Sequence, residues 1–241
     1  FLFYTDLHYE TPGALTGAQF RDDPSQARPS VTTPASHVPG AEEQKAAVNN
    51  KTLFTGINHV IDWNKKWNTS SGVYFSSTDF TNPTLRNYEE RAEPNIGLRS
   101  VTKNSSVKGS FKNILSFGTE LQYMDGEIDI YENNCGSRAD MLSSDEFASS
   151  PLSLFGQYDL LYKERFNITF GLSANFTKVK FSRDFQSTIT KTRTFDPVIS
   201  PRLAVLKKFS EGFALFGSYS RGYSPPTIAE LFPSREIFDN D

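Results

Sequence analysis

Apolar and polar residues alternate along most of this chain, and the alternation is clearest between residues 166 and 176. If this run is a strand, six apolar side chains share one face, and the residues between them, which are mostly polar, share the other. Successive side chains of a strand point to opposite faces, so the run predicts a sheet with one apolar wall and one polar wall. The apolar set consists of Phe166, Ile168, Phe170, Leu172, Ala174 and Phe176.

Soluble sheets and membrane barrels both produce such alternation, and strand length helps to distinguish them. Several runs exceed the roughly 5–6 residues of an average globular strand and reach the roughly 9–11 residues that cross a bilayer. Strand length therefore favours a barrel. The pattern predicts about nine strands, at Phe1–Glu10, Lys51–Trp63, Trp67–Phe80, Pro94–Lys103, Lys112–Tyr131, Leu152–Tyr162, Phe166–Arg183, Asp196–Lys207 and Gly212–Tyr223.

The connections between these strands alternate in length. An up-and-down outer-membrane barrel has long extracellular loops at one end and short periplasmic turns at the other. A segment of about forty residues is too long for a neutral connector, so we expect the first long segment to be disordered or functional. The long connections are Thr11–Asn50, Thr81–Glu93, Glu132–Pro151, Asp184–Phe195 and the residues after Ser224; the short ones are Asn64–Lys66, Asn104–Phe111, Lys163–Arg165 and Lys208–Glu211.

The run Phe111–Tyr131 changes phase near its end. Apolar residues occupy one face as far as Tyr123, and Asp125, Glu127 and Asp129 then occupy that same face. A strand that leaves hydrocarbon for water would lose its apolar requirement in this way, and a bulge would produce the same change. Alternate carboxylates could bind a hard cation, but we expect a solvated strand end and no metal site.

Charge and hydropathy argue against two classes of protein, a dedicated nucleic-acid binder and a helical membrane protein. The formal net charge is −3, so no basic surface is available for a nucleic acid. No apolar run approaches the roughly 18–20 residues of a membrane-spanning helix. The 21 Phe and 10 Tyr residues suit strands, and they could also supply the interfacial girdles of a barrel.

The ends of the sequence and its cysteine carry little chemistry. Phe1 opens strand-like sequence without an initiating Met or a signal peptide, so we interpret the sequence as a fragment. Cys135 is the single cysteine, so it has no partner for an internal disulfide and cannot alone make a metal site. We expect an exposed loop thiol.

An enzyme is not predicted. His8, His37 and His59 lie far apart, and none belongs to a metal-ligand spacing such as His-Glu-x-x-His. The sequence contains neither a Gly-x-Ser-x-Gly elbow nor a phosphate-binding glycine loop. We therefore expect no catalytic residue, no resident metal and no cofactor.

Two C-terminal motifs carry a family resemblance. Ile199-Ser-Pro-Arg-Leu-Ala-Val205 and Leu215-Phe-Gly-Ser-Tyr-Ser-Arg-Gly-Tyr-Ser-Pro-Pro-Thr-Ile-Ala-Glu-Leu-Phe232 resemble the barrel of TonB-dependent outer-membrane receptors. Two other stretches resemble the iron-complex branch with its ferric-citrate-type siderophore receptors: Tyr9–Thr16 with Gln26–Pro29, and Asn82-Pro83 with Asn87–Glu93. Pro225 and Pro226 lack backbone N–H groups, so we expect them to end ladder pairing.

The resemblance implies an all-β, antiparallel, up-and-down transmembrane barrel of which residues 1–241 supply about nine to ten strands. The plug domain and the terminal strands would lie outside this sequence. Such a receptor imports an iron–chelate (siderophore) complex across the outer membrane of a Gram-negative bacterium, surrounded by outer-membrane lipid. TonB would bind the absent N-terminal region. The ligand could also be cobalamin or a glycan, and two other classes stay open: a secreted β-sandwich or adhesin-like carbohydrate-binding module, and a passive porin-like channel.

Ligand contacts are expected in the long loops. Arginine stays charged and can hold a carboxylate through two hydrogen bonds, so it suits a ferric chelate that carries carboxylates. Arg91 could instead pair with Glu89 or Glu90. The tentative ligand-binding residues are Arg21, Arg28, Arg86, Tyr88, Arg91 and Arg138.

Two tryptophans offer a test of the membrane interpretation. Trp63 and Trp67 flank the short connection Asn64–Lys66. In a barrel they would lie at the periplasmic membrane interface, whereas a soluble protein would bury them.

Overall fold

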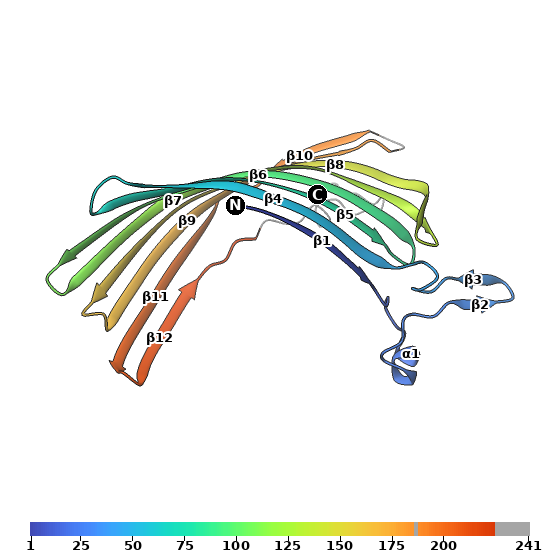
Figure 1. The fold of residues 1–241 in the computed structure, drawn as a ribbon, viewed down its shortest axis with the longest axis horizontal. Helices are drawn as coiled ribbons and strands as arrows, with labels where there is room; N and C mark the ends of the chain where they lie inside the picture. Colours follow the sequence, from blue (N-terminus) through green and yellow to red (C-terminus); the bar gives the residue numbers. More distant parts are fainter. Residues whose placement is uncertain (186–187, 225–241) are drawn as a thin grey trace.

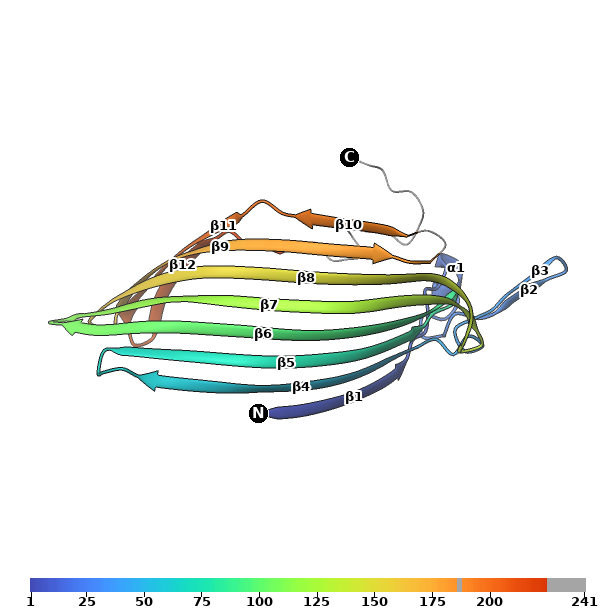
Figure 2. The same cartoon turned by 90° about the horizontal axis from the view of Figure 1, so that it is seen from above.

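The computed structural model describes residues 1–185 and 188–224 and consists mainly of antiparallel strands. Ten strands form one sheet in the order β1-β4-β5-β6-β7-β8-β9-β11-β12, with β10 paired to the C-terminal part of β9. The sheet is a wide arch (Figure 1), and its strands run side by side (Figure 2). Its strands are β1 (Leu2–Glu10), β4 (Ala47–Asp62), β5 (Trp67–Pro83), β6 (Asn87–Lys108), β7 (Phe111–Asn134), β8 (Ser137–Tyr162), β9 (Phe166–Arg183), β10 (Ile189–Thr194), β11 (Val198–Ser210) and β12 (Phe213–Ser220).

The topology confirms an up-and-down sheet. From β4 to β9, each strand pairs with the strand that follows it in sequence, and all nine predicted strands are present. The alternative of two stacked sheets is wrong, because the described residues form one large sheet and one small two-stranded sheet, β2 (Val31–Thr33) with β3 (Ser36–Val38). Within the described part of the chain the large sheet is not closed, and β1 and β12 form its edges.

The two faces of the sheet differ in exposure, as β9 illustrates. Phe170 and Leu172 are 55% and 46% exposed, whereas Thr169 and Asn175 are each 8% exposed. Curvature crowds the side chains on the concave face, so the less exposed polar set lies there and the apolar set lies on the convex face. Exposing apolar surface to water costs about 25 cal/mol per Å², but such a surface is stable against hydrocarbon. The arrangement matches the wall of an outer-membrane barrel, in which the outward face is the apolar one.

The two tryptophans flank the first short turn, between β4 and β5. Trp63 is 64% exposed, and its Nε1–H donates to Thr69 Oγ1 at 2.9 Å. Trp67 packs edge-to-face on Phe117, with 6.4 Å between ring centroids. Neither ring is in a closed core, which agrees with a barrel and not with a soluble protein.

Three strands extend well beyond their predicted bounds. β6, β7 and β8 contain 22, 24 and 26 residues. The loops expected at Thr81–Glu93 and Glu132–Pro151 are therefore wrong: these segments continue the strands and reverse at residues 84–86 and at Cys135–Gly136. Cys135 and Gly136 both have positive φ, 51° and 83°, as a two-residue hairpin turn of type I′ requires. Polar residues cover both faces of the extensions, so no apolar alternation marks them as strands.

The remaining connections lie closer to their predicted bounds. Thr11–Asn50 contains α1 (Gly17–Asp22), the β2–β3 hairpin and the first residues of β4, and Asp184–Phe195 contains β10. The turn expected within Asn104–Phe111 is confined to residues 109–110. Pro225 to Leu231, with most of the C-terminal half of the Leu215–Phe232 motif, lie outside the described residues.

The phase change in β7 does not come from a bulge. The pairing of β7 with β6 keeps one register on both sides of residues 123–127, and the pairing with β8 shifts only beyond Ile130. Asp125, Glu127 and Asp129 therefore continue the face of Tyr123. Beyond Tyr123 this face of the strand is no longer apolar. The change agrees with a strand that leaves hydrocarbon and continues into water, and not with a bulge. We call the part of the sheet whose convex face is apolar the apolar zone.

No helix in the described ranges is long and apolar enough to span a membrane.

Candidate functional site

The candidate site is a cavity at the end of the sheet that carries the long segment 11–46. In outer-membrane barrels the longer connections are extracellular, so we interpret the end that carries this segment as the extracellular one. The cavity has a volume of about 630 Å³ and lies between that segment, the β5–β6 turn and the ends of β7 and β8. It is lined by Thr11, Gly13, Arg28, Ala46, Thr84, Leu85, Arg86, Asn87, Ile130, Leu142 and Ser143.

Local hydrogen bonds give the segment 11–46 a defined structure. α1 begins with a capping box: Thr16 Oγ1 accepts from the Gln19 backbone N–H, and the Gln19 side chain accepts from the Thr16 N–H. The segment closes on itself where the Thr11 N–H donates to the Ala46 carbonyl at 2.8 Å. It is therefore ordered, and it forms one wall of the cavity.

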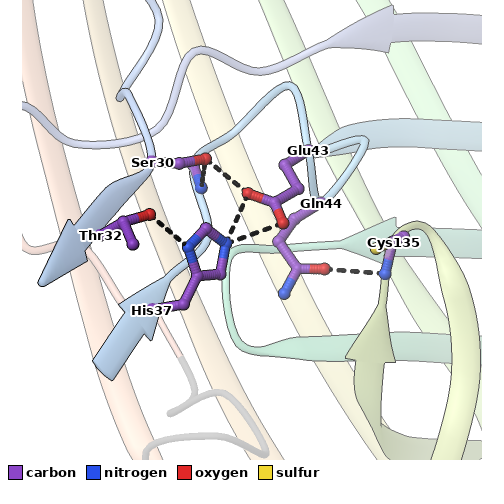
Figure 3. A network of polar contacts seen from close by, with 7 residues as sticks. Ser30, Thr32, His37, Glu43, Gln44 and Cys135 are labelled. Atoms are coloured by element: carbon purple, nitrogen blue, oxygen red, sulfur yellow. Dashed lines mark hydrogen bonds and ion pairs between the residues drawn. The ribbon is translucent and has the colours of Figure 1, made fainter. Parts of the chain in front are cut away.

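Glu43 organises the β2–β3 side of this segment (Figure 3). Its carboxylate accepts hydrogen bonds from Ser30 Oγ at 2.5 Å and from His37 Nε2 at 2.9 and 3.0 Å. The opposite ring nitrogen of His37 lies 2.8 Å from Thr32 Oγ1. The hydrogen bond from Ser30, and next that from His37, lower the pKa of Glu43 below its ordinary value of 4.5.

A second contact anchors the segment to the barrel wall. Gln44, which is 7% exposed, accepts from the backbone N–H of Cys135 at 2.9 Å through its Oε1 (Figure 3). Cys135 lies at the tip of the β7–β8 hairpin and is exposed, which confirms the expected exposed thiol.

Two of the predicted arginines meet at the cavity. Arg28 comes from the segment 11–46 and Arg86 from the β5–β6 turn, and both line it. Arg28 Nη1 makes one long hydrogen bond, 3.4 Å, to the Ala14 carbonyl, which leaves most of its five donors for other partners. The tertiary structure thus brings together two cationic groups that are far apart in the sequence.

Ser143, which lines the cavity, has a buried hydroxyl. It is 6% exposed, and its Oγ has no hydrogen-bond partner among the described residues. A buried hydroxyl without a partner costs free energy, so such a group is expected to have a partner in the working state of the protein.

The other four predicted ligand residues lie elsewhere. Arg21 is exposed at the end of α1 and does not line the cavity. Tyr88 continues the face that carries Ile96 and Leu98, and therefore lies on the convex side. Arg138 joins this side, because its Nη1 donates to Glu90 at 3.1 Å.

Arg91 is committed to partners on its own strand. Its guanidinium pairs with Glu89 and lies 3.8 Å from Glu93, and it covers the Phe80 ring at 5.2 Å. Pairing of Arg91 with Glu89 is one of the two pairings that were expected as an alternative to ligand binding.

Polar groups cover the concave face below the cavity. Arg99 Nη1 donates to Glu120 at 3.0 Å, and the Arg99 guanidinium lies over the Phe155 ring. A further cavity of about 420 Å³ is lined in part by Glu120, Asn175 and Arg221. No group of three or more His, Cys, Asp or Glu side chains in the described ranges could hold a metal ion.

Sequence reasoning missed Gln44, Asn133 and Ser143. Asn133 and Ser143 lie within the segment that was expected to be a loop, where no pairing could be inferred. The Asn-Asn-Cys-Gly run is a turn signal that could have located the β7–β8 hairpin and its buried asparagine.

Residues 3–240 match the family described as TonB dependent receptor-like, beta-barrel, and the chain belongs to this family. Its members are receptors, not enzymes, and their barrels lie in the outer membrane of Gram-negative bacteria. The curated proteins include no match to this sequence.

Solved structures share the fold at low sequence identity. The unliganded ferric citrate transporter FecA has a TM-score of 0.73 and 12% identity, over 90% of this chain and 32% of that one. The ferric-catecholate import receptor Fiu from Escherichia coli K12 has a TM-score of 0.60 and 9% identity, over 91% and 40%. BauA, the ferric preacinetobactin receptor of Acinetobacter baumannii, has a TM-score of 0.55 and 13% identity, over 72% and 30%. The chain thus spans between three tenths and four tenths of these proteins.

Proposed function

We propose that the receptor containing this chain captures a ferric chelate that carries carboxylates and imports it across the outer membrane in a TonB-dependent manner. The observation that carries the proposal is the extracellular-end cavity, which Arg28 and Arg86 both line. We call this cavity the capture pocket. Its volume of about 630 Å³ lies within the roughly 300–1,000 Å³ that is usual for small-molecule sites.

The pocket chemistry favours carboxylates over other chelating groups. Two guanidinium groups match the charge and the planar geometry of carboxylates. Leu85, Ile130 and Leu142 supply apolar contact for the carbon skeleton. FecA is a ferric citrate transporter and Fiu is a ferric-catecholate import receptor, so the shared fold does not select the chelate. The choice of a carboxylate chelate is supported by the pocket.

The proposal extends to parts of the receptor beyond this chain. Residues 1–241 form part of the barrel domain, and the complete receptor adds the remaining strands and a plug, to which TonB binds from the periplasm. The share of FecA and Fiu that this chain covers supports this division.

Uptake of radiolabelled ferric citrate by iron-starved cells expressing the complete receptor tests the function. A charge-assisted hydrogen bond contributes about 1.5–3 kcal/mol, so we expect Arg28→Ala and Arg86→Ala each to weaken binding at least about tenfold. Arg138→Ala is the matched control, because Arg138 lies on the convex side and pairs with Glu90. Its uptake should stay within twofold of wild type.

Two results would reject the proposal. Uptake that persists unchanged in cells without TonB would indicate a passive channel. Equal losses in the Arg86→Ala and Arg138→Ala variants would mean that the capture pocket does not select the ligand. A ferric tris-catecholate serves as the comparison chelate, and it should compete poorly with ferric citrate.

A further inference from the structure

We propose that Asn133 is the positioning residue of the capture pocket, because its buried amide fixes the two arginine-bearing segments relative to each other. Its effect on ligand binding rests on the proposed function, whereas its effect on the two segments does not.

Asn133 lies at the end of β7 and is 8% exposed. Both polar atoms of its side chain, Nδ2 and Oδ1, form hydrogen bonds. Its Nδ2 donates to the Gln44 carbonyl at 2.9 Å and to the Thr84 carbonyl at 2.6 Å. Its Oδ1 accepts from the Gly136 N–H at 2.8 Å. One side chain therefore bridges the segment 11–46, the β5–β6 turn and the β7–β8 hairpin.

The bonds to the β5–β6 turn hold the backbone beside Arg86. The Asn133 N–H donates to the Arg86 carbonyl at 3.3 Å, and the Asn133 side chain holds the carbonyl of Thr84. Thr84 Oγ1 in turn accepts from the Arg86 N–H at 3.2 Å. The main chain of Arg86 is thus fixed on both sides by groups that Asn133 contacts.

The bond to Gln44 reaches Arg28 through a compact turn. The Gln44 N–H donates to the Gly40 carbonyl at 3.0 Å, and the Ala41 N–H donates to the Arg28 carbonyl at 2.8 Å. Gly40 packs so closely that a Cβ on it would lie 2.5 Å from the Arg28 carbonyl oxygen, so only glycine fits. The turn and the Arg28 backbone therefore move as one unit, and Asn133 attaches that unit to the wall.

Fixed spacing matters because the ligand must be held by two guanidinium groups at once. If the segments moved independently, binding would have to supply the free energy of ordering them, and affinity would fall. The Asn133 side chain is bonded to both segments, so its loss weakens the attachment of both arginine-bearing segments at once. Neither arginine itself is altered, which makes Asn133 a positioning residue and not a ligand-binding one.

The test compares Asn133→Asp with Asn134→Asp in the complete receptor. Asp at 133 keeps the size and the acceptor but replaces the amide donor with an oxygen that faces two carbonyls. Asn134 is the exposed neighbour, so the same substitution there is a matched control. Folding of each variant is checked by the resistance of the detergent-solubilised barrel to denaturation by SDS at room temperature.

Hydrogen exchange of the ligand-free receptor is the first readout. We expect Asn133→Asp to raise exchange about tenfold in residues 40–46 and 84–87, because hydrogen bonds to both segments are lost. Asn134→Asp should stay within twofold of wild type. Unchanged exchange in either segment of the Asn133→Asp receptor overturns the proposal.

Uptake of ferric citrate is the second readout. We expect Asn133→Asp to raise KM about tenfold and to leave the maximal rate within twofold, because translocation is untouched. A fall in maximal rate at constant KM would overturn the positioning role and indicate a general defect. If wild type takes up no ferric citrate, the proposed ligand is wrong, and the exchange result alone decides the role of Asn133.

Discussion

The two ends of β9 follow opposite rules for burial. In its first part, apolar Phe170 and Leu172 are exposed on the convex face, and polar Thr169 is buried. Near the end of the strand on the extracellular side, Val179 and Phe181 are 2% and 1% exposed. The strand is continuous, so the inversion comes from its surroundings and not from its backbone.

The difference shows where the solvent changes along the strand. Against hydrocarbon, apolar side chains are stable on the outside of the wall, and polar ones gather inside. Beyond the apolar zone, Lys178 and Lys180 occupy the convex face, and apolar side chains such as Phe181 become buried as in a water-soluble protein. The extracellular extension is therefore stabilised by its own small core.

A buried ion pair belongs to this small core. Arg183 Nε and Nη2 donate to the two carboxylate oxygens of Asp145 at 2.6 and 2.8 Å. The hydrogen bonds to Asp145 are the first cause of the raised pKa of Arg183. Asp145 and Arg183 are each 8% exposed, so the charges depend on each other.

Breaking that pair should have the largest effect. Asp145→Ala leaves a buried guanidinium without its carboxylate, and we expect the extension to lose about 3–5 kcal/mol of local stability. Hydrogen exchange in residues 143–147 and 179–183 measures this loss, while the lipid-facing part of β9 stays protected. The double variant Asp145→Leu/Arg183→Met should recover most of the stability, and a double variant as unstable as the single one would contradict the explanation.

Introducing an arginine at two positions of the convex face, one inside the apolar zone and one beyond it, sharpens the comparison. Phe170→Arg puts a charge into hydrocarbon and should destabilise the barrel by about 2–4 kcal/mol. Lys180→Arg lies on the same face above the apolar zone and should change stability by less than about 0.5 kcal/mol. Urea unfolding in phospholipid vesicles measures both. Equal effects would mean that Phe170 does not face lipid.

A pH change should affect only the part of the molecule that lies in water. The pKa of Glu43 is lower in the folded protein than its ordinary value, so its bonds to Ser30 and His37 stabilise the segment fully above that ordinary value. This contribution is lost as the pH falls through the lowered pKa. We expect proteolysis by an acid-active protease to accelerate modestly near residues 30–43 below about pH 4. Glu43→Gln should remove the pH dependence, and acceleration that persists in it would reject the role of Glu43.

Strand positions within the apolar zone could be predicted because one face of the sheet is apolar throughout that zone. Phe166 to Phe176 must present an apolar side chain at every second position, and this requirement is visible in the sequence. The extensions of β6 to β8 could not be predicted, since in water both of their faces accept polar residues. The turn Cys135–Gly136 was missed for the same reason, although its glycine suits the positive φ that the turn requires.

For the candidate site, the sequence predicted the type of side chain, arginine, but not which arginines would form the site. Arginine was the expected donor, and Arg28 and Arg86 do line one cavity, but Arg91 and Arg138 are equally plausible in sequence and are held by Glu89 and Glu90. Which arginine has a nearby carboxylate depends on the pairing register, and that register was hidden in segments without apolar alternation.

By itself, the sequence determined which side chains share a face and that one of the two faces is apolar, because side-chain direction alternates with a fixed period along any strand. Only the tertiary structure decided how far the strands continue beyond the apolar zone and which residues meet at their ends. Those outcomes depend on hydrogen bonds between distant segments, such as those of Asn133, and such bonds leave no periodic trace in the order of the residues.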